Sequence, residues 1–329
     1  MNAHTTHPVA ANVGVSAYVH SETTFEMVMS MTMIDEQAAV LALTKATHDK
    51  PWHYTARAVA ATGSALKLLD GELDGLQDND KAHAVVIRGM VRHDDLDRAR
   101  ELIASMSSRG VRLVTVLDEA YPGNMFWTNN YQPFLWIRGH IALEDHRSVA
   151  IVGEYDREHA ATAARILSEA GLTVVAPLYT ELGVAVHENA ATAGGRTLGV
   201  LDRGIDQSQQ PGRYATIAQQ VAERGALISQ FWPATITTGR TAALTYIVTC
   251  GLAATVYVVD GRHNGFSQRH VTNALKTGKP VFVPQQLHQE QPWVAQAGSR
   301  GGITAVQDID DFCKQAVNLV DMDSQPTMF

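Results

Sequence analysis

A polar loop with the sequence Asp260-Gly261-Arg262-His263-Asn264-Gly265 joins an apolar run to the start of a predicted helix. Backbone N–H groups at a helix start favour an anion, so this loop is the best single candidate for a ligand site. Asp260, Arg262, Asn264 and Gly265 are its candidate binding residues. An ordinary Asn-Gly turn explains the same residues, and both interpretations stay open here.

A second polar turn follows another apolar run and contains Gly153, Glu154, Tyr155 and Asp156, with Arg157 at the start of the next helix. The turn lacks the G-x-G-x-x-G pattern of dinucleotide-binding proteins and the phosphate-cradling loop that goes with it. The chain also has no Walker A sequence and no G-x-S-x-G motif. These absences argue against a typical NAD enzyme, a P-loop ATPase and a hydrolase built on a nucleophile elbow.

Five further residues are candidates for ligand contacts. Arg203 and Asp206 follow the third apolar run, where they are either ligand contacts or a solvated loop charge and a capping Asp. His187 lies on a predicted helix and either packs there or contacts a ligand. Arg240 stands near the start of a helix, as a ligand cation or a surface side chain, and Arg269 lies in the last crossover helix.

The elements that position these residues recur six times, as a short apolar run, a polar bend and an amphipathic helix. Gly171 and Gly225 follow two of the helices and are expected to be left-handed caps. Near-continuous apolar runs that alternate with helices predict a parallel sheet buried on both faces, with ligands bound at the carboxyl ends of its strands. The fold class is therefore α/β, an extended Rossmann-like fold with a mainly parallel, three-layer αβα sheet. The runs are Ser148–Gly153, Leu172–Pro177, Thr197–Leu201, Ala226–Ser229, Ala254–Asp260 and Pro280–Pro284.

The chain divides into five expected parts. Helix-like segments at Met31–Thr47, Tyr54–Ala60, Ala65–Leu69 and Asp95–Ser107 precede a predicted strand, Val111–Leu117. An aromatic stretch then connects this small helical module to the apolar runs. The parts are an N-terminal tail (1–30), the helical module (31–116), the aromatic connector (117–147), the Rossmann-like domain (148–322) and a C-terminal tail (323–329).

Composition is that of an ordinary globular protein, with 329 residues, of which 45% are hydrophobic and 18% charged. The formal net charge of −8 argues against a protein whose whole surface coats nucleic acid. Cys250 and Cys313 lack metal-ligand spacing and are expected to be buried thiols, and we predict no metal and no cofactor. The N-terminus does not resemble a signal peptide, and no apolar run approaches the ~20 residues of a membrane span. We expect a cytoplasmic protein.

Eight short motifs together point to a known protein family. They are Tyr121-Pro122, Pro133 to Gly139, Ile151-Val152-Gly153, Gly194-Gly195-Arg196-Thr197, Gly204-Ile205-Asp206, Gly225 to Ser229, Val258-Val259-Asp260 and Lys279 to Pro284. These motifs resemble those of the DprA/Smf family of DNA-processing proteins. The likeness runs from about Asp35 to Asp310 and includes the helical first third, which resembles the family's SAM/HhH-like module. We find no counterpart of the winged-helix tail of many members.

The sequence departs from the family pattern where the family binds DNA. Glu154-Tyr155 replaces Ser-Arg after the first strand, and Thr245-Tyr246-Ile247 replaces Arg-Asn-Arg. The family's Ser-Gly-Leu-Ala-Xaa-Gly-Ile-Asp turn becomes residues 176–183, in which Pro177 and Glu181 replace glycines and Tyr179 replaces Ala. Each lost phosphate contact weakens DNA binding and reduces its salt dependence by about one counterion.

The resemblance implies a protein that does not catalyse a reaction, binds single-stranded DNA in a basic pocket at the strand ends and delivers it to a RecA-type recombinase. It also implies a homodimer formed by the later part of the Rossmann-like domain, where Leu244, Ile247 and Val248 give an apolar helix face. The DNA contact would use surviving cations, and Glu154→Arg should strengthen it. These cations are Arg157, Arg203, Arg240, Arg262 and Arg269.

Two other functions remain open. One is a binding or sensing module for a nucleotide-derived small molecule, because the carboxylates of Glu154, Glu181 and Asp260 accept hydrogen bonds from ribose but repel phosphate. The other is an enzyme resembling the LOG phosphoribohydrolases, which need a Pro-Gly-Gly-Xaa-Gly-Thr loop and a downstream Glu. Here the matching stretch holds only Gly194-Gly195, so this is the least favoured function.

Overall fold

A computed structural model describes residues 31–47, 51–206 and 212–323, and the expected tail 1–30 and residues 324–329 lie outside it. The six apolar runs form parallel strands, which confirms the predicted mainly parallel α/β fold. The sheet has nine strands among the described residues, in the order β1-β2-β6-β5-β4-β3-β7-β8-β9. The parallel strands are β3 (Ser148–Val152), β4 (Thr173–Pro177), β5 (Thr197–Val200), β6 (Ala226–Ser229), β7 (Thr255–Val258), β8 (Val281–Pro284) and β9 (Ile303–Val306).

Helices cover both faces of the sheet. Alternate residues of each strand point to opposite faces, so each strand packs against helices on both sides. In β3, Val149 and Ile151 pack in one hydrophobic cluster, while Ala150 and Val152 pack in another. This burial on both faces is why the apolar runs are nearly continuous. The first face carries α7 (Arg157–Glu169), α8 (Glu181–Thr192), α9 (Gly212–Arg224) and α14 (Ile309–Asp323), and the second carries α10 (Gly239–Leu252) and α11 (Phe266–Lys276).

Two antiparallel strands extend the sheet at one edge. β1 (Val111–Thr115) pairs with β2 (Phe134–Gly139), and β2 pairs with β6. The sheet therefore runs through the expected boundaries at 117 and 148, and the aromatic connector supplies one of its strands. Residues 134–137 are completely buried, which is the same pattern that marks the parallel strands.

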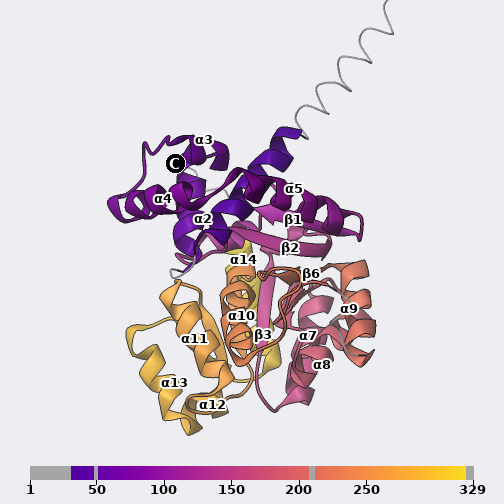
Figure 1. Cartoon of the computed structure of the whole chain (residues 1–329). Coiled ribbons are helices and arrows are strands. Elements are labelled where there is room, and N and C mark those ends of the chain that lie inside the picture. The colour runs from indigo at the N-terminus through magenta and orange to yellow at the C-terminus, as the bar shows by residue number, and fades with distance from the viewer. Residues whose placement is uncertain (1–30, 48–50, 207–211, 324–329) are drawn as a thin grey trace, which may run out of the picture.

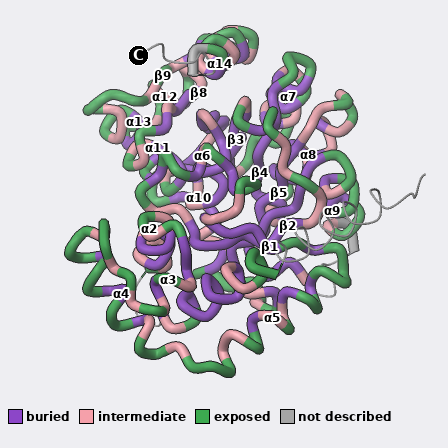
Figure 2. The backbone as a smooth tube through the Cα atoms, turned by 90° about the horizontal axis from the view of Figure 1, so that it is seen from above, coloured by how far each residue is buried: buried purple, intermediate pink, exposed green. Residues whose placement is uncertain are grey.

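The N-terminal part is mostly helical, as expected, and lies over the β1–β2 edge (Figures 1 and 2). One of its helices, α4, was not predicted, because its exposed Val85, Val86 and Met90 obscure the apolar stripe of the buried face. Two aspartates in its first turn suit a helix N-terminus. The helices are residues 31–45, α2 (His53–Thr62), α3 (Ala65–Asp70), α4 (Asp78–Met90) and α5 (His93–Ser107).

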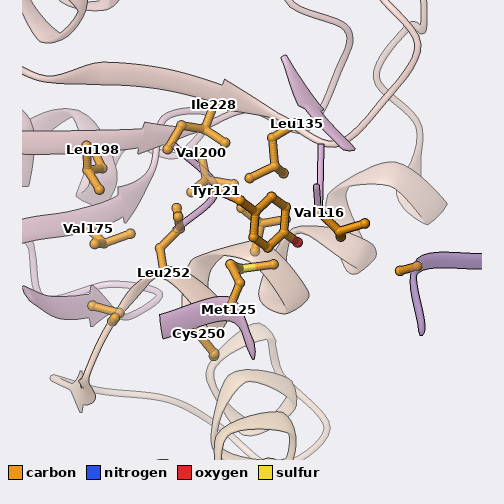
Figure 3. Close-up of a cluster of buried hydrophobic side chains, with 14 of the residues drawn as sticks. Val116, Tyr121, Met125, Leu135, Val175, Leu198, Val200, Ile228, Cys250 and Leu252 are labelled. Atoms are coloured by element: carbon orange, nitrogen blue, oxygen red, sulfur yellow. The ribbon is translucent and has the colours of Figure 1, made fainter. Parts of the chain in front are cut away.

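A buried cluster fixes the connector to α10 and the sheet. Figure 3 shows Tyr121 near Met125 and Leu135, with Leu252 at the end of α10 close by. The Tyr121 hydroxyl donates to the Gln132 carbonyl at 2.6 Å, so this buried phenol is satisfied. The remaining short elements are α6 (Gly123–Phe126), η1 (Leu143–His146), α12 (Gln285–Glu290), α13 (Pro292–Ala297) and η3 (Gly298–Arg300).

The two glycines expected to cap helices differ in the structure. Gly171 has φ of 76° and is left-handed, as expected after α7. Gly225 is not among the residues with positive φ, so the expected left-handed cap is absent there. Glycine is needed at this position because a Cβ would lie 2.0 Å from the Thr197 carbonyl oxygen on the neighbouring strand.

Candidate nucleic-acid interface

The switch point of the sheet lies between β3 and β7. From β3 the chain continues through β4, β5 and β6 to one side, and β7 then lies on the other side of β3. The turns after β3 and β7 therefore meet at the carboxyl edge, where open α/β sheets bind ligands. We call the region where these two turns meet the strand-end crevice, after the place where such sheets bind ligands. The predicted residues Gly153, Glu154, Asp260 and Arg262 lie in these turns.

The Asp260 carboxylate accepts three backbone hydrogen bonds from the turn after β3. Its Oδ1 accepts from the Glu154 N–H at 2.5 Å, and its Oδ2 accepts from the N–H groups of Tyr155, at 2.9 Å, and Asp156. Consecutive N–H groups that converge in this way form an anion-binding nest. Here the anion is a side chain of the protein itself.

The Glu154 carboxylate crosses the crevice in the opposite direction. Its Oε1 accepts from the Ser267 N–H in the first turn of α11, at 3.2 Å, and its Oε2 lies 3.3 Å from Arg262 Nε. The Glu154 side chain is 8% exposed. A Cβ at Gly265 would lie 2.1 Å from Glu154 Oε1, so this glycine makes room for the carboxylate. Each side of the crevice thus binds a carboxylate from the other side: Asp260 is bound by the turn after β3, and Glu154 by the start of α11.

The rim of the strand-end crevice is acidic. Arg157 Nη1 pairs with Glu181 Oε2 at 3.6 Å, and Asp156 caps α7 by accepting from the His159 N–H at 3.0 Å. The arginine that was expected to attract DNA is therefore beside a carboxylate. The crevice turns and the rim hold two guanidinium groups, those of Arg157 and Arg262. They hold four carboxylates, those of Glu154, Asp156, Glu181 and Asp260.

Three other predicted residues lie apart from the crevice turns. Arg203 Nε donates to the buried Asp202 carboxylate at 3.0 Å, and Asp206 pairs with Arg109 at 3.3 Å. His187 is 1% exposed, with Nδ1 at 2.6 Å from Thr197 Oγ1 and Nε2 at 3.2 Å from the Ala176 carbonyl oxygen. Burial lowers the pKa of His187 to about 4, so it is a neutral packing residue.

A groove beside the crevice collects cations. This depression, of about 790 Å³, is lined by residues of α10 and α11 and by the predicted residues Asn264 and Gly265. Its cations are Arg240, Arg269 and Lys276, and none of them forms an ion pair with a described residue. No Asp or Glu belongs to its described lining. Two of the predicted cations, Arg240 and Arg269, are thus brought together here.

A second depression, of about 850 Å³, continues this groove toward the N-terminal helices. The two share Asn130, Arg240, Leu244 and Tyr246, and we call their combined lining the basic groove. The second part adds Trp52, Trp232 and Lys45, again without a carboxylate in its described lining; Lys45 itself pairs with Asp95 at 3.2 Å. Asn130 Oδ1, at the joint, is buried with no hydrogen-bond partner among the described residues.

Sequence reasoning missed several lining residues of the basic groove. Lys45 and Trp52 come from the helical module, and they line the groove because Trp52 packs against Phe134 and Trp232, far along the chain. Lys276 had a local signal: Arg269, Thr272 and Lys276 share one face of α11 at helical spacing, and all three line the groove.

Part of the apolar face that we expect at a dimer interface is buried inside the chain. Val248 is completely buried against the sheet, so it cannot contact a second copy. Leu244 and Ile247 line the second part of the basic groove. Leu244, Ile247 and Val248 do not form one free face, because α10 packs between the sheet and the helices α6 and α11 and is apolar on several sides.

Among the described residues, no three His, Cys, Asp or Glu side chains are grouped so that they could hold a metal ion. Cys250 and Cys313 are buried free thiols, as expected. Burial raises the pKa of Cys250 to about 12, which keeps it protonated and unreactive. No helix in the described part of the chain is both long and apolar enough to cross a membrane.

Comparisons with known proteins agree with the motifs. The family described as DNA recombination-mediator protein A matches residues 112–317. Protein Smf from Synechocystis sp. is 25% identical over 143 residues, which make up 40% of this chain and 35% of that protein. The match therefore spans about a third of the length of this curated relative.

Two solved structures share the fold. DNA processing protein A from Helicobacter pylori, whose structure concerns its single-stranded DNA binding mode, aligns with a TM-score of 0.54 and 20% identity over 63% of this chain and 96% of its own. DNA processing protein A from Streptococcus pneumoniae aligns with a TM-score of 0.57 and 19% identity over 81% of this chain and 98% of its own. At these identities the likeness shows the architecture alone.

Proposed function

Since the chain belongs to the DNA recombination-mediator protein A family of DNA-processing proteins, we propose that it binds single-stranded DNA in the basic groove. It would act there in DNA recombination or DNA-mediated transformation, without catalysing a reaction. The observation that carries this proposal is the grouping of Arg240, Arg269 and Lys276 on one surface with no carboxylate in its described lining. The DNA ligand of the H. pylori relative supports the choice of ligand.

The charge distribution favours the basic groove over the strand-end crevice. A phosphate backbone is attracted by cations that have no internal partner and repelled by the carboxylates on the crevice rim. Arg157 and Arg262, in contrast, already pair with Glu181 and Glu154. Because the whole chain carries a formal net charge of −8, binding depends on this local grouping and weakens steeply with salt.

The second part of the basic groove suits unpaired bases. Tyr246, Trp52 and Trp232 line it, and stacking of a base on an aromatic side chain is worth about 1–3 kcal/mol. The Trp52 and Trp232 rings are themselves in edge contact, with centroids 6.3 Å apart. Single-stranded DNA therefore fits better than duplex DNA, whose bases are already stacked.

Two partners complete the proposal. By resemblance to the family, the protein delivers DNA to a RecA-type recombinase and forms a homodimer through the later part of the Rossmann-like domain. The dimer surface must exclude Val248, which is buried within the chain. A light-scattering mass of one chain would contradict the dimer, and unchanged recombinase loading on DNA in the presence of this protein would contradict the delivery step.

The alternative functions receive less support from the geometry. A nucleotide-derived small molecule would need free carboxylates for its ribose, but those of Glu154 and Asp260 already accept hydrogen bonds from the protein backbone. The Gly194-Gly195 pair of the LOG-like hypothesis precedes β5 and so lies at the amino edge of the parallel strands, away from the crevice.

Fluorescence anisotropy with a labelled oligo-dT at low salt tests the proposal. We expect wild-type binding, a large loss in the Arg240→Glu/Arg269→Glu variant, and no loss in the control Arg300→Glu, which reverses an exposed charge outside the groove. Absence of wild-type binding at micromolar protein would refute the function. Equal losses in the groove variant and the control would refute the groove as its site.

A further inference from the structure

Two carboxylates of the chain occupy the anion-binding positions of the switch point. Asp260 fills the nest formed by the N–H groups of Glu154, Tyr155 and Asp156. Glu154 accepts from the Ser267 N–H at the start of α11, a helix whose N-cap Gly265 has no side chain to cap it. Both are places where a ligand phosphate would bind in an open α/β sheet.

The neighbouring helix starts are also closed by side chains of this chain. Asp156 caps α7, Thr180 caps α8 by accepting from the Gly183 N–H at 3.0 Å, and Thr238 caps α10 by accepting from the Thr241 N–H at 3.1 Å. In each of the helices α7, α8, α10 and α11, at least one N–H group of the first turn thus donates to a side chain of the protein itself. A phosphate at these helix starts has to displace such an acceptor.

We propose that Asp260 and Glu154 determine ligand specificity as a carboxylate plug, which stands in for phosphate at the switch point and excludes phosphate esters from the strand-end crevice. A tethered carboxylate competes at high effective concentration with a phosphate in solution. A phosphate that displaced Asp260 would also lie close to the Glu154 carboxylate, which is 8% exposed and weakly screened.

The plug also determines the path of the DNA. With the crevice closed to phosphate, the backbone of a bound strand follows Arg240, Arg269 and Lys276 along the basic groove. This second consequence rests on the proposed function, whereas the exclusion of phosphate does not. The two are separated by testing the plug with inorganic phosphate and the groove with oligo-dT.

The direct test follows the backbone amide NMR signals of Glu154, Tyr155 and Asp156 during titration with millimolar inorganic phosphate. We expect no movement in the wild-type protein, because Asp260 holds these N–H groups. In Asp260→Ala we expect the same signals to move and the melting temperature to rise with phosphate. The control Asp94→Ala removes an exposed carboxylate on α5 and should respond as the wild type does.

Movement of the wild-type signals would overturn the plug, as would a folded Asp260→Ala that does not respond. If Asp260→Ala fails to fold, Asp260→Asn takes its place, because its amide oxygen still accepts hydrogen bonds while the negative charge is gone. A folded Asp260→Asn without a phosphate response also overturns the plug. If the wild-type protein does not bind oligo-dT, the proposed function is refuted, but the conclusion that the plug excludes phosphate is unaffected.

Discussion

The Tyr179 hydroxyl lies 2.7 Å from Thr245 Oγ1 and thereby links the end of β4 to α10. Tyr179 also donates to the Ala242 carbonyl at 3.2 Å, and its ring meets Phe266 edge-on at 6.0 Å. Burial raises the pKa of Tyr179, so the hydroxyl stays protonated. Both residues depart from the DprA/Smf pattern, in which Ala and Arg are expected. The two departures therefore meet, and the tyrosine fills space that an arginine side chain would need.

Restoring the family arginine alone should harm the fold. Thr245 is completely buried and meets the Tyr179 hydroxyl, so Thr245→Arg places a long cation in a packed site. We expect the free energy of unfolding to fall by about 1–3 kcal/mol or more, as for other overpacked sites, with no gain in oligo-dT affinity. Urea denaturation and anisotropy measure the two effects. Thr245→Ser, which keeps the hydroxyl that meets Tyr179, is the control, and a stable Thr245→Arg with tighter DNA binding would contradict the account.

The salt dependence of DNA binding should reflect three cations. If Arg240, Arg269 and Lys276 each neutralise one phosphate, the slope of log K against log salt is about −2, at ~0.7 per contact for single strands. Replacing any one of them by Ala should reduce the slope by about 0.7. Anisotropy titrations over a salt series provide the slopes. A slope that stays the same in all three variants would show that the cations do not contact phosphate.

Features made by residues close together in the sequence could be predicted from it, whereas contacts between distant segments could not. Continuous apolar runs are enough to predict the parallel sheet, because a strand that is buried on both faces has apolar residues at nearly every position. The same pattern in Phe134–Ile137 predicts a connector rather than a strand, because aromatic residues and prolines surround it, and the structure shows a strand there. The exchange between Glu154 and Asp260 depends on which strands are neighbours, and the spacing of residues does not reveal that. The basic groove depends on the packing of Trp52 against Trp232, which lies 180 residues further along the chain.

Acid should destabilise the protein through two buried histidines. Burial lowers the pKa of both His187 and His270 to about 4, whereas in the unfolded chain each titrates near 6.5. Between these values the unfolded state binds more protons, so the free energy of unfolding falls as pH falls through this window. Each histidine contributes up to ~1.4 kcal/mol per pH unit.

Chemical denaturation at a series of pH values between about 7 and about 4.5 measures this loss. His187→Gln should make the pH dependence shallower, because one of the two buried titrating groups is gone. His263→Gln changes an exposed histidine and should leave the pH dependence as in the wild type. A wild-type protein whose stability is flat over this window would contradict the buried, neutral state of these side chains.

Glu154→Arg distinguishes an inherited DNA crevice from a plugged one. From the family pattern alone, this change should strengthen DNA binding, because it restores a cation after the first strand. In the structure, the new arginine would face Arg262 and the start of α11, and the Ser267 N–H would lose its acceptor. We expect the free energy of unfolding to fall by about 1–3 kcal/mol, the cost of an unsatisfied buried group.

The comparison variant for DNA binding is Glu154→Gln, which removes the same negative charge but keeps an acceptor oxygen. Both variants lose the same repulsion, and high salt screens the charge that the arginine adds, so we expect them to bind oligo-dT equally well at high salt. Clearly tighter binding by Glu154→Arg than by Glu154→Gln at high salt would place the DNA backbone in the strand-end crevice and contradict the plug.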